Sequence, residues 1–222
     1  MSTKLEWILD RLEADGGAVP VRSTDGWVLV LRENVGYLVD DEARDSALER
    51  LRLATALDPA RIVSVPDDVL AGVVVGMRPA ERVERLRRCA ELRLAGAPWK
   101  AYPGIGRPGV ERIELFGGVR AVLALESNGA RTLVRLGYGS VGRHYDATYR
   151  SVQSAAAGEL VASVEAFGRA HLLLRRHGQD VCRRVAPACA ECSVARRCAA
   201  LASGLAIRDP FATDYKPARR EG

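Results

Sequence analysis

Four of the five cysteines lie within seventeen residues of one another, and this grouping constrains the fold more than any other feature of the sequence. They are Cys182, Cys189, Cys192 and Cys198, with the spacing C-x6-C-x2-C-x5-C. No basic-then-apolar leader opens the chain, so we expect a reducing compartment, where structural disulfides are rare. The grouping therefore predicts a metal site, whereas the distant Cys89 is expected to be an ordinary buried thiol.

The spacing of these cysteines favours an iron-sulfur cluster over zinc. Structural zinc usually takes two tight pairs of ligands, but only one C-x2-C pair occurs here. Four irregularly spaced thiolates in a compact loop suit a cubane, so the expected cofactor is a [4Fe-4S] cluster, with zinc as the alternative. Four arginines stand between the ligands and would offset the cluster's charge or contact phosphates, unless they are simply solvated: Arg183, Arg184, Arg196 and Arg197.

Most of the remaining chain has helical periodicity. Apolar residues recur at helical spacing in the segments 5–12, 42–57, 78–94, 110–116, 128–136, 145–157 and 159–177. Residues 27–38 fit either a buried helix or a strand, and the helix expected after them favours a helix. No alternating run supports a sheet of any size, so the predicted fold class is all-α, with ten or so short helices in two packed groups. A polar tail is expected from Gly204 to Gly222.

The charge is unevenly distributed along the chain. Residues 101–222 hold 18 basic and 11 acidic side chains, whereas residues 1–100 hold 15 and 17. A basic half suits a phosphate-facing surface, because neutralised phosphates release counterions, but a generally arginine-rich solvated surface fits equally well. Apolar runs such as 28–31 and 73–75 fall far short of the ~20 residues that span a bilayer. We therefore expect a cytoplasmic protein, associated with the nucleoid if the source is bacterial, and no membrane contact.

A glycine-rich turn, Pro103-Gly104-Ile105-Gly106, separates two predicted helices. Its glycines let the backbone approach a ligand closely, and free amides at the start of the next helix suit a phosphate. Many helix-helix turns contain glycine and bind nothing. The motif gains weight because the cysteines follow about eighty residues later.

Together these features resemble the endonuclease III and adenine-glycosylase superfamily, the helix-hairpin-helix DNA glycosylases. The matching parts are Tyr102–Arg107, Leu125–Arg135, His177-Gly178 and the four cysteines. The resemblance implies two helical domains with a DNA-binding groove between them: residues 22–126, which hold the hairpin, and residues 1–21 plus 127–222, which hold the cluster loop. It also implies a monomer that binds double-stranded DNA.

The resemblance implies which residues meet DNA. The hairpin and the cysteine loop are expected to face phosphates through Gly104, Ile105, Gly106, Arg107, Arg183 and Arg184. Asn34 lies in Val30–Gly36, roughly where the family places residues that fill the hole left by a flipped base, and Tyr37 follows as a stacking candidate. Both side chains could equally face the core.

Two positions depart from the family's pattern. Lyase-competent members carry a lysine two residues past the second hairpin glycine, but here that residue is Pro108, which has no amine to form a Schiff base. Eighteen residues further on, Glu126 replaces the family's catalytic aspartate. Ser127 is expected to cap the next helix, whose N-terminus favours a charged Glu126. Alternatively, Glu126 is only a favourable charge at a helix start.

The sequence thus predicts a monofunctional glycosylase that removes a damaged or mispaired base, with Glu126 as its carboxylate. The alternative is a DNA-binding or damage-sensing protein that keeps the hairpin and the cluster without the chemistry. A third class, an iron-sulfur regulator of transcription, lacks a distinct recognition helix. His177 is expected to brace the cluster loop, and Trp99 to pack at the entrance of the hairpin.

Overall fold

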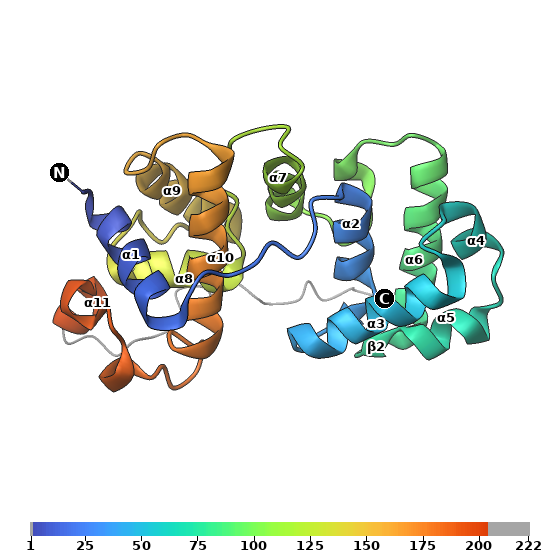
Figure 1. Cartoon of the computed structure of the whole chain (residues 1–222), viewed down its shortest axis with the longest axis horizontal. Coiled ribbons are helices and arrows are strands. Elements are labelled where there is room, and N and C mark those ends of the chain that lie inside the picture. Colours follow the sequence, from blue (N-terminus) through green and yellow to red (C-terminus); the bar gives the residue numbers. More distant parts are fainter. Residues whose placement is uncertain (1, 204–222) are drawn as a thin grey trace. The chain divides into compact units, whose positions relative to one another are not determined.

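The computed structural model describes residues 2–203, so the predicted tail from Gly204 to Gly222 lies outside the described residues (Figure 1). Within that range the chain forms eleven α-helices, three short 3-10 helices and one pair of two-residue strands. The prediction of an all-α fold is therefore confirmed. None of the helices in residues 2–203 is long and apolar enough to cross a membrane.

The chain divides into two compact units. The central unit comprises residues 22–117, and the cysteine unit comprises residues 1–21 together with 118–222, of which 2–21 and 118–203 are described. The sequence predicts a boundary at residue 126. In the structure, residues 118–126 belong to the cysteine unit, so Glu126 and the cysteines share one unit.

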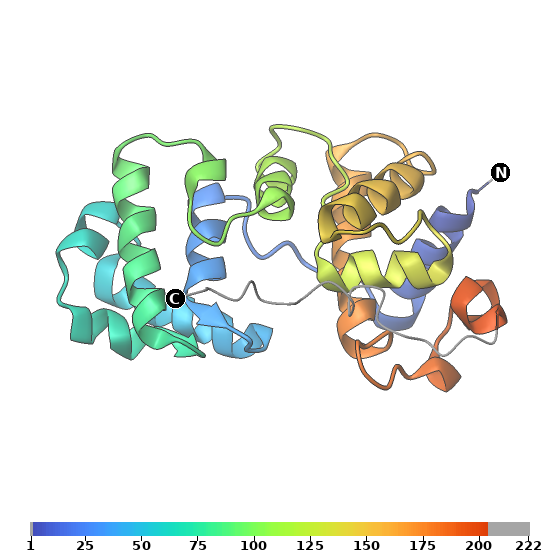
Figure 2. The same cartoon turned by 180° about the vertical axis from the view of Figure 1, so that it is seen from behind.

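Six α-helices build the central unit around an apolar core. They are α2 (Gly26–Asn34), α3 (Asp41–Thr55), α4 (Pro59–Ser64), α5 (Asp67–Val73), α6 (Pro79–Leu94) and α7 (Arg107–Phe116), with the 3-10 helix η1 (Trp99–Ala101) before α7. Helix α2 packs against α3, α6 and α7, and α4 packs against α6 (Figure 2). Their fully buried side chains include Leu31, Leu51, Ile62, Leu70 and Leu86.

Residues 27–38 are helical only as far as Asn34. The chain then forms β1 (Gly36–Tyr37), which pairs in parallel with β2 (Val75–Gly76). Gly76 has a φ of 84°, and a Cβ there would lie 2.1 Å from the carbonyl oxygen of Tyr37. Only glycine allows this close pairing, which brings the residues after the two strands side by side.

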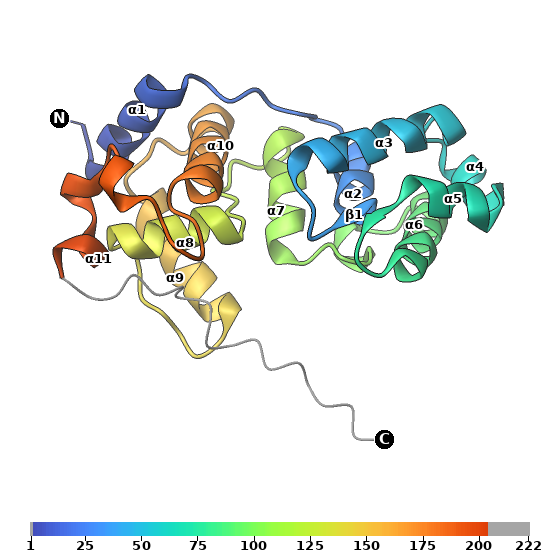
Figure 3. The same cartoon turned by 90° about the horizontal axis from the view of Figure 1, so that it is seen from below.

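The cysteine unit contains α1 (Lys4–Gly16), α8 (Ser127–Leu136), α9 (Tyr145–Ala157), α10 (Val164–Asp180) and α11 (Ala199–Ala202), with η2 (Cys189–Glu191) and η3 (Ala195–Arg197) in the cysteine loop. Helix α8 packs against α9, α10 and α11, and α10 also packs against α1 (Figure 3). Helix α10 begins at Val164 and not at Glu159, because the Ser163 side chain caps it by accepting the N–H of Ala166.

Candidate functional site

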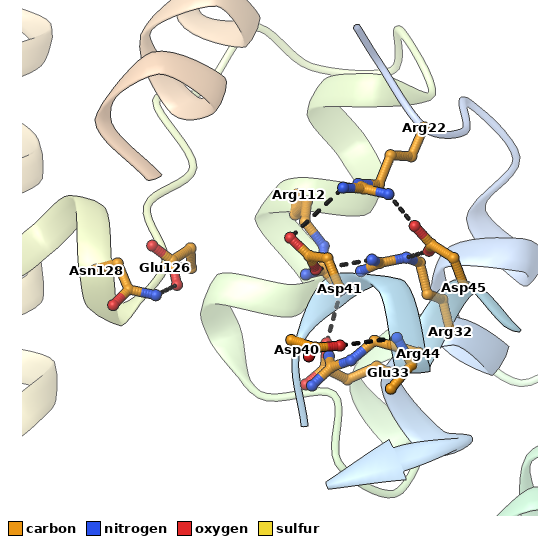
Figure 4. A network of polar contacts seen from close by, with 11 residues as sticks. Arg22, Arg32, Glu33, Asp40, Asp41, Arg44, Asp45, Arg112, Glu126 and Asn128 are labelled. Carbon is orange, nitrogen blue, oxygen red and sulfur yellow. Dashed lines mark hydrogen bonds and ion pairs between the residues drawn. The ribbon is translucent and has the colours of Figure 1, made fainter. Parts of the chain in front are cut away.

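Glu126, and not the predicted Ser127, is the N-cap of α8. Its Oε1 accepts the N–H of Gly129 at 2.8 Å, and its Oε2 accepts the Nδ2 of Asn128 at 2.8 Å (Figure 4). The longer side chain of glutamate reaches the same first-turn amide that a shorter cap would satisfy. The carboxylate is partly buried and fixed at the positive end of the helix.

A continuous run of hydrogen bonds leads from Glu126 to the cysteine loop. Asn128 donates to Glu126 and, through its Oδ1, accepts a bond of 2.7 Å from Nη2 of Arg131. The buried Arg131 also donates to the carbonyl oxygens of Gly178, at 2.7 Å, and Cys182, at 3.2 Å. A Cβ on Gly178 would lie 2.5 Å from the carbonyl oxygen of Asn128, so glycine is needed for α10 to approach α8. The first turn of α8 and the first cysteine are thereby held in one network.

Arg135, one turn further along α8, is buried against the cysteines themselves. Its Nη1 donates to the carbonyl oxygens of Cys182, at 3.1 Å, and Arg183, at 2.8 Å, and approaches Sγ of Cys182 at 3.4 Å. The thiol of Cys198 in turn donates to the carbonyl oxygen of Arg135 at 3.4 Å. A cation placed beside the sulfurs in this way stabilises thiolates.

The four cysteines line a single cavity. Its other walls are Arg135, His177 and mainly apolar side chains, among them Leu136, Val181, Val194 and Leu201. Burial raises the pKa of the Cys189 and Cys192 thiols, and the neighbouring cysteines raise it further. The thiolate forms of these two cysteines are therefore disfavoured unless a nearby positive charge offsets them, as a metal centre would.

The four cysteine side chains do not stand as close together as the ligands of a single metal ion do. Among the described residues, no three or more Cys, His, Asp or Glu side chains stand close enough together to hold a single metal ion. Zinc, with sulfur ligands at about 2.3 Å, would require such a tight group. The donor set is that of a four-thiolate metal centre.

His177 lies between the cysteine cavity and a neighbouring groove. Its Nε2 is 3.7 Å from Sγ of Cys192. Burial lowers the pKa of its imidazole to about 4, and the charge of Asp15 opposes that change while Arg176 adds to it. A neutral ring that packs against a cysteine sulfur agrees with the expected bracing role.

The hairpin forms the turn before α7. Gly104 has a φ of 74°, Ile105 is buried, and Gly106 is the N-cap of α7 without a side-chain cap. Pro108 stands in the first turn of α7 and contributes no N–H. The exposed glycines and the exposed Arg107 leave the start of this helix accessible to an anion.

Asn34 faces the core, which is one of the two orientations that the sequence left open; the other was entry into a duplex. Its side chain is 0% exposed, and its Nδ2 donates to the carbonyl oxygens of Val30, at 3.0 Å, and Pro103, at 3.1 Å. A Cβ on Gly104 would lie 3.1 Å from the Asn34 Oδ1. In the structure, Asn34 supports the hairpin through its hydrogen bond to Pro103.

Several arginines of the central unit are paired with carboxylates (Figure 4). Arg32 donates to Asp45 at 2.6 Å and to Asp41 at 2.8 Å, and Arg22 pairs with the same two residues. Arg44 and Arg112 both reach Glu33, at 3.3 and 3.2 Å. These ion pairs connect α2, α3 and α7 to one another.

An apolar tip follows the two strands, and sequence reasoning missed it. Leu38 comes directly after β1 and is 72% exposed, and Met77 comes directly after β2 and is 57% exposed. The guanidinium of the buried Arg82 packs over the ring of Tyr37 at 4.7 Å and supports the tip. Two large exposed apolar side chains on adjoining loops are the kind of wedge that enters between bases. The signal in the sequence, a Leu two residues after Gly36 and a Met directly after Gly76, is too weak to find it.

The loop arginines Arg183 and Arg184 are both exposed. Arg183 donates to the carbonyl oxygen of Ala186 at 3.1 Å, so it also helps to shape the loop. Arg197 packs over the ring of Trp7 at 4.7 Å and joins the loop to α1. Arg183 and Arg197 therefore stabilise the cysteine loop, whether or not they also contact phosphates.

No protein-family model matches the chain, and no curated protein matches it by sequence. Solved structures do match. A trapped endonuclease III–DNA covalent intermediate aligns with a TM-score of 0.71 at 17% identity, over 92% of this chain and 99% of that one. A non-covalent endonuclease III–DNA complex gives 0.71 at 19% identity over the same shares, and a thermostable thymine-DNA glycosylase gives 0.69 at 14% identity over 90% and 95%. The chain therefore has the endonuclease III fold, and the resemblance to the helix-hairpin-helix glycosylases is confirmed at the level of the fold.

Proposed function

We propose that this chain is a DNA N-glycosylase that hydrolyses the bond between the sugar and a damaged or mispaired base flipped out of double-stranded DNA. Glu126 is the proposed catalytic carboxylate. The observation that carries the proposal is its placement: a carboxylate held by two hydrogen bonds at the N-cap of α8, on a chain with the endonuclease III fold. The exposed hairpin, the apolar tip and the basic second half support duplex DNA as the partner.

In the proposed reaction the bond from the sugar to the base breaks as positive charge develops on the sugar ring. The Glu126 carboxylate opposes that charge, or it takes a proton from the water whose oxygen forms the new bond to the sugar. Its two hydrogen bonds fix its orientation before substrate binds. A displacement of a catalytic group by about 1 Å can lower the reaction rate about 100-fold, so a carboxylate that is already fixed in place favours a fast reaction.

The four cysteines are proposed to hold a [4Fe-4S] cluster. When bound, it would cross-link a loop that has little regular structure and few buried apolar side chains of its own. Arg135 and His177 would lie against its sulfur ligands. The protein is proposed to act as a monomer.

We propose that the enzyme has no lyase step. The sequence contains three lysines, Lys4, Lys100 and Lys216. The amine of Lys4 donates to the carbonyl oxygen of Leu136 at 2.6 Å, and Pro108 stands where lyase-competent relatives carry theirs. Borohydride should therefore trap no adduct, and the product should be an abasic site. An adduct lost in Lys100→Ala would show that Lys100 has taken over this role.

The second candidate function is a damage sensor that binds DNA without excision. One observation favours it: both oxygens of Glu126 already accept hydrogen bonds from α8, which leaves only their remaining lone pairs for substrate. Both candidates require the same fold and the same cluster, and they differ in excision alone.

Single-turnover assays on a panel of lesion-bearing duplexes separate the two candidates. Glu126→Gln should reduce excision by about 100-fold or more, and Glu126→Asp should preserve or raise it if the extra methylene is a handicap. Glu165→Gln, an exposed carboxylate in the first turn of α10, is the matched control and should change nothing. Excision that survives Glu126→Gln would reject the site. Binding by the parent and by Glu126→Asp without any excision would favour the sensor.

A further inference from the structure

Arg82, near the start of α6, carries a buried positive charge whose N–H donors are unused. Only 4% of the residue is exposed, and its Nε is fully buried without a hydrogen bond. Its guanidinium forms no hydrogen bond or ion pair with any residue in the range 2–203, and it packs over the ring of Tyr37 at 4.7 Å. An aromatic ring offsets only part of the cost of burying a charge, because it satisfies few of the N–H donors. Arg82 is therefore a cation that still lacks a partner.

Two glutamates act on Arg82 through their charge, and both are shared by other arginines. Burial lowers the pKa of the Arg82 guanidinium, and the charge of Arg85 lowers it further. Glu81 and Glu33 oppose that change. Four other arginines lie within 3.3 Å of these two carboxylates: Arg44 and Arg112 at Glu33, and Arg78 and Arg85 at Glu81. In this group five arginines meet two carboxylates, and the excess of positive charge favours an anion.

Arg82 lies beside the apolar tip. The backbone N–H of Met77 donates to the carbonyl oxygen of Tyr37 at 3.3 Å, and Leu38 directly follows Tyr37. Tyr37 therefore joins the two exposed side chains of the tip, and its ring contacts the guanidinium of Arg82. The unpartnered cation is thus next to Leu38 and Met77 in the structure.

One turn further along α6, Arg85 lies beside the hairpin. Its Nη1 is 3.7 Å from the position that a Cβ on Gly104 would occupy. Residues three apart on a helix lie on the same face, so Arg82 and Arg85 connect the tip to the hairpin along one face of α6. A DNA backbone that approaches both the hairpin and the tip would therefore pass Arg82.

We propose that Arg82 binds a phosphate of the duplex backbone beside the apolar tip. The inference rests on the proposed function, because it takes double-stranded DNA as the ligand. A guanidinium suits a phosphate, since its planar fork donates parallel N–H bonds to two oxygens. A bound phosphate would supply the hydrogen bonds that the buried cation lacks in the free protein.

The first test is the salt dependence of duplex binding by Arg82→Met, measured on several sequences. The substitution keeps an apolar stem over Tyr37 and removes the charge. Loss of one phosphate contact should weaken binding about tenfold at about 0.1 M salt, and should reduce the slope of log affinity against log salt concentration by about one, whatever the sequence. Arg82→Lys, which keeps the charge but not the fork, should retain the slope. A loss confined to one sequence would mean that Arg82 reads a base edge, and would overturn the phosphate assignment.

Arg87→Met is the matched control, because it removes the same charge from the same helix. The Arg87 donors are taken up by three backbone carbonyl oxygens in residues 62–65 and by Asp67. The control should lower the midpoint of thermal unfolding and leave the salt slope unchanged. Arg82→Met should do the reverse, since the charge that it removes has no partner in the free protein. A lower midpoint with unchanged binding would make Arg82 a structural residue only.

Duplexes with a single neutral methylphosphonate locate the contact. At the phosphate that Arg82 binds, this replacement should weaken binding by the parent about tenfold and binding by Arg82→Met less than about twofold, because the variant has no contact to lose. Equal losses in both proteins at every position, or an unchanged salt slope, would overturn the inference and leave the glycosylase in place. A parent that binds no duplex would reject both proposals. A located contact in a protein that excises nothing would support the inference and reject only the glycosylase.

Discussion

Buried arginines serve different purposes in the two units. In the central unit, the buried Arg32 is paired with Asp41 and Asp45, and the half-buried Arg112 with Glu33. In the cysteine unit, Arg131 and Arg135 donate to backbone carbonyl oxygens of the cysteine loop. The hydrogen bonds of the central-unit arginines go to carboxylate side chains on regular helices. Those of the cysteine-unit arginines depend in part on an irregular loop keeping its backbone in place, although Arg131 also donates to Asn128 and Gly178.

This difference indicates what each unit depends on. A carboxylate on a helix is in position once the helix forms, whereas the carbonyl groups of the cysteine loop belong to turns and two single-turn 3-10 helices. Val194 is the one fully buried side chain that the segment 182–198 contributes to the core. Four metal-ligand bonds would supply the missing constraint, so metal binding and the stability of the cysteine unit should be coupled.

The largest expected effect is therefore that of Cys192→Ala. The variant should lose the visible absorbance and the iron of the proposed cluster, and amide exchange should rise throughout the cysteine loop and at the end of α10. Amides of α2, α3 and α6 should keep most of their protection. The measurement is hydrogen exchange by mass spectrometry on full-length protein.

Cys89→Ala is the control for this experiment. Cys89 is buried on α6, and burial raises the pKa of its thiol to about 12, so it is an inert core group. Its replacement should cost about 1 kcal/mol through a small cavity and should leave the cluster absorbance unchanged. Equal loss of protection in both units after Cys192→Ala would show that the two units do not differ in their dependence on metal.

Replacement of one buried arginine in each unit should sharpen the contrast. Arg135→Met leaves the carbonyl groups of Cys182 and Arg183 without this donor, at a cost of about 1 to 3 kcal/mol, and should speed the loss of iron to a chelator. Arg32→Met leaves Asp41 and Asp45 without their main partner and should cost about 2 kcal/mol, because the two carboxylates are partly exposed. It should not change iron loss. If both variants released iron at the same rate, Arg135 would have no special role at the cluster.

The hairpin can be tested with a substitution that the fold tolerates. Gly106 has a φ of −75°, and the nearest neighbour of a Cβ there is Cδ of Pro108 at 3.9 Å, so Gly106→Ala should leave stability within about 0.5 kcal/mol. If a phosphate approaches this backbone, the added methyl group should weaken duplex binding by about tenfold. Gly104→Ala is a poor substitute, because φ there is 74° and the variant would be strained. Tight binding by Gly106→Ala would mean that the hairpin is only a turn.

Much of the fold could be predicted because its signals are local. Helical periodicity and caps found most of the helices, and the spacing of the four cysteines predicted the cavity that they line. The placement of Glu126 at the start of α8 also followed from its position in the chain. In each case the residues that determine the feature are near neighbours in sequence.

The features that escaped prediction depend on partners far along the chain. Arg131 and Arg135 look like ordinary helix charges, and their burial follows from carbonyl groups about fifty residues later. Asn34 looks like an exposed polar residue, and its burial follows from the carbonyl group of Pro103, 69 residues away. A polar side chain is buried only where such partners satisfy it, and sequence periodicity carries no record of that pairing.

The smallest expected effect is the acid sensitivity of the central unit, which depends on Glu33. Burial alone would raise the pKa of the Glu33 carboxyl, but the charges of Arg112 and Arg44 outweigh burial and lower it. The pKa of a glutamate carboxyl in an unfolded chain is about 4.3. Because the folded pKa is the lower one, the contribution of Glu33 to stability is complete above about pH 5 and is lost as the pH falls through the folded pKa.

Glu33→Gln should therefore lower the free energy of unfolding at pH 7 by no more than about 1 kcal/mol, since its side chain is 35% exposed and solvent screens the pair. The difference from the parent should shrink as the pH approaches 3, because the parent then loses the same interaction. Hydrogen exchange of α2 and α7 amides between pH 3 and pH 7 would measure it. Glu49→Gln removes an exposed pair with Arg52 and should cost less than about 0.5 kcal/mol at pH 7. If the difference in free energy of unfolding between the parent and Glu33→Gln grew as the pH fell, burial would outweigh the charges of the arginines at Glu33. The ion pairs of the central unit would then not stabilise it in the way proposed here.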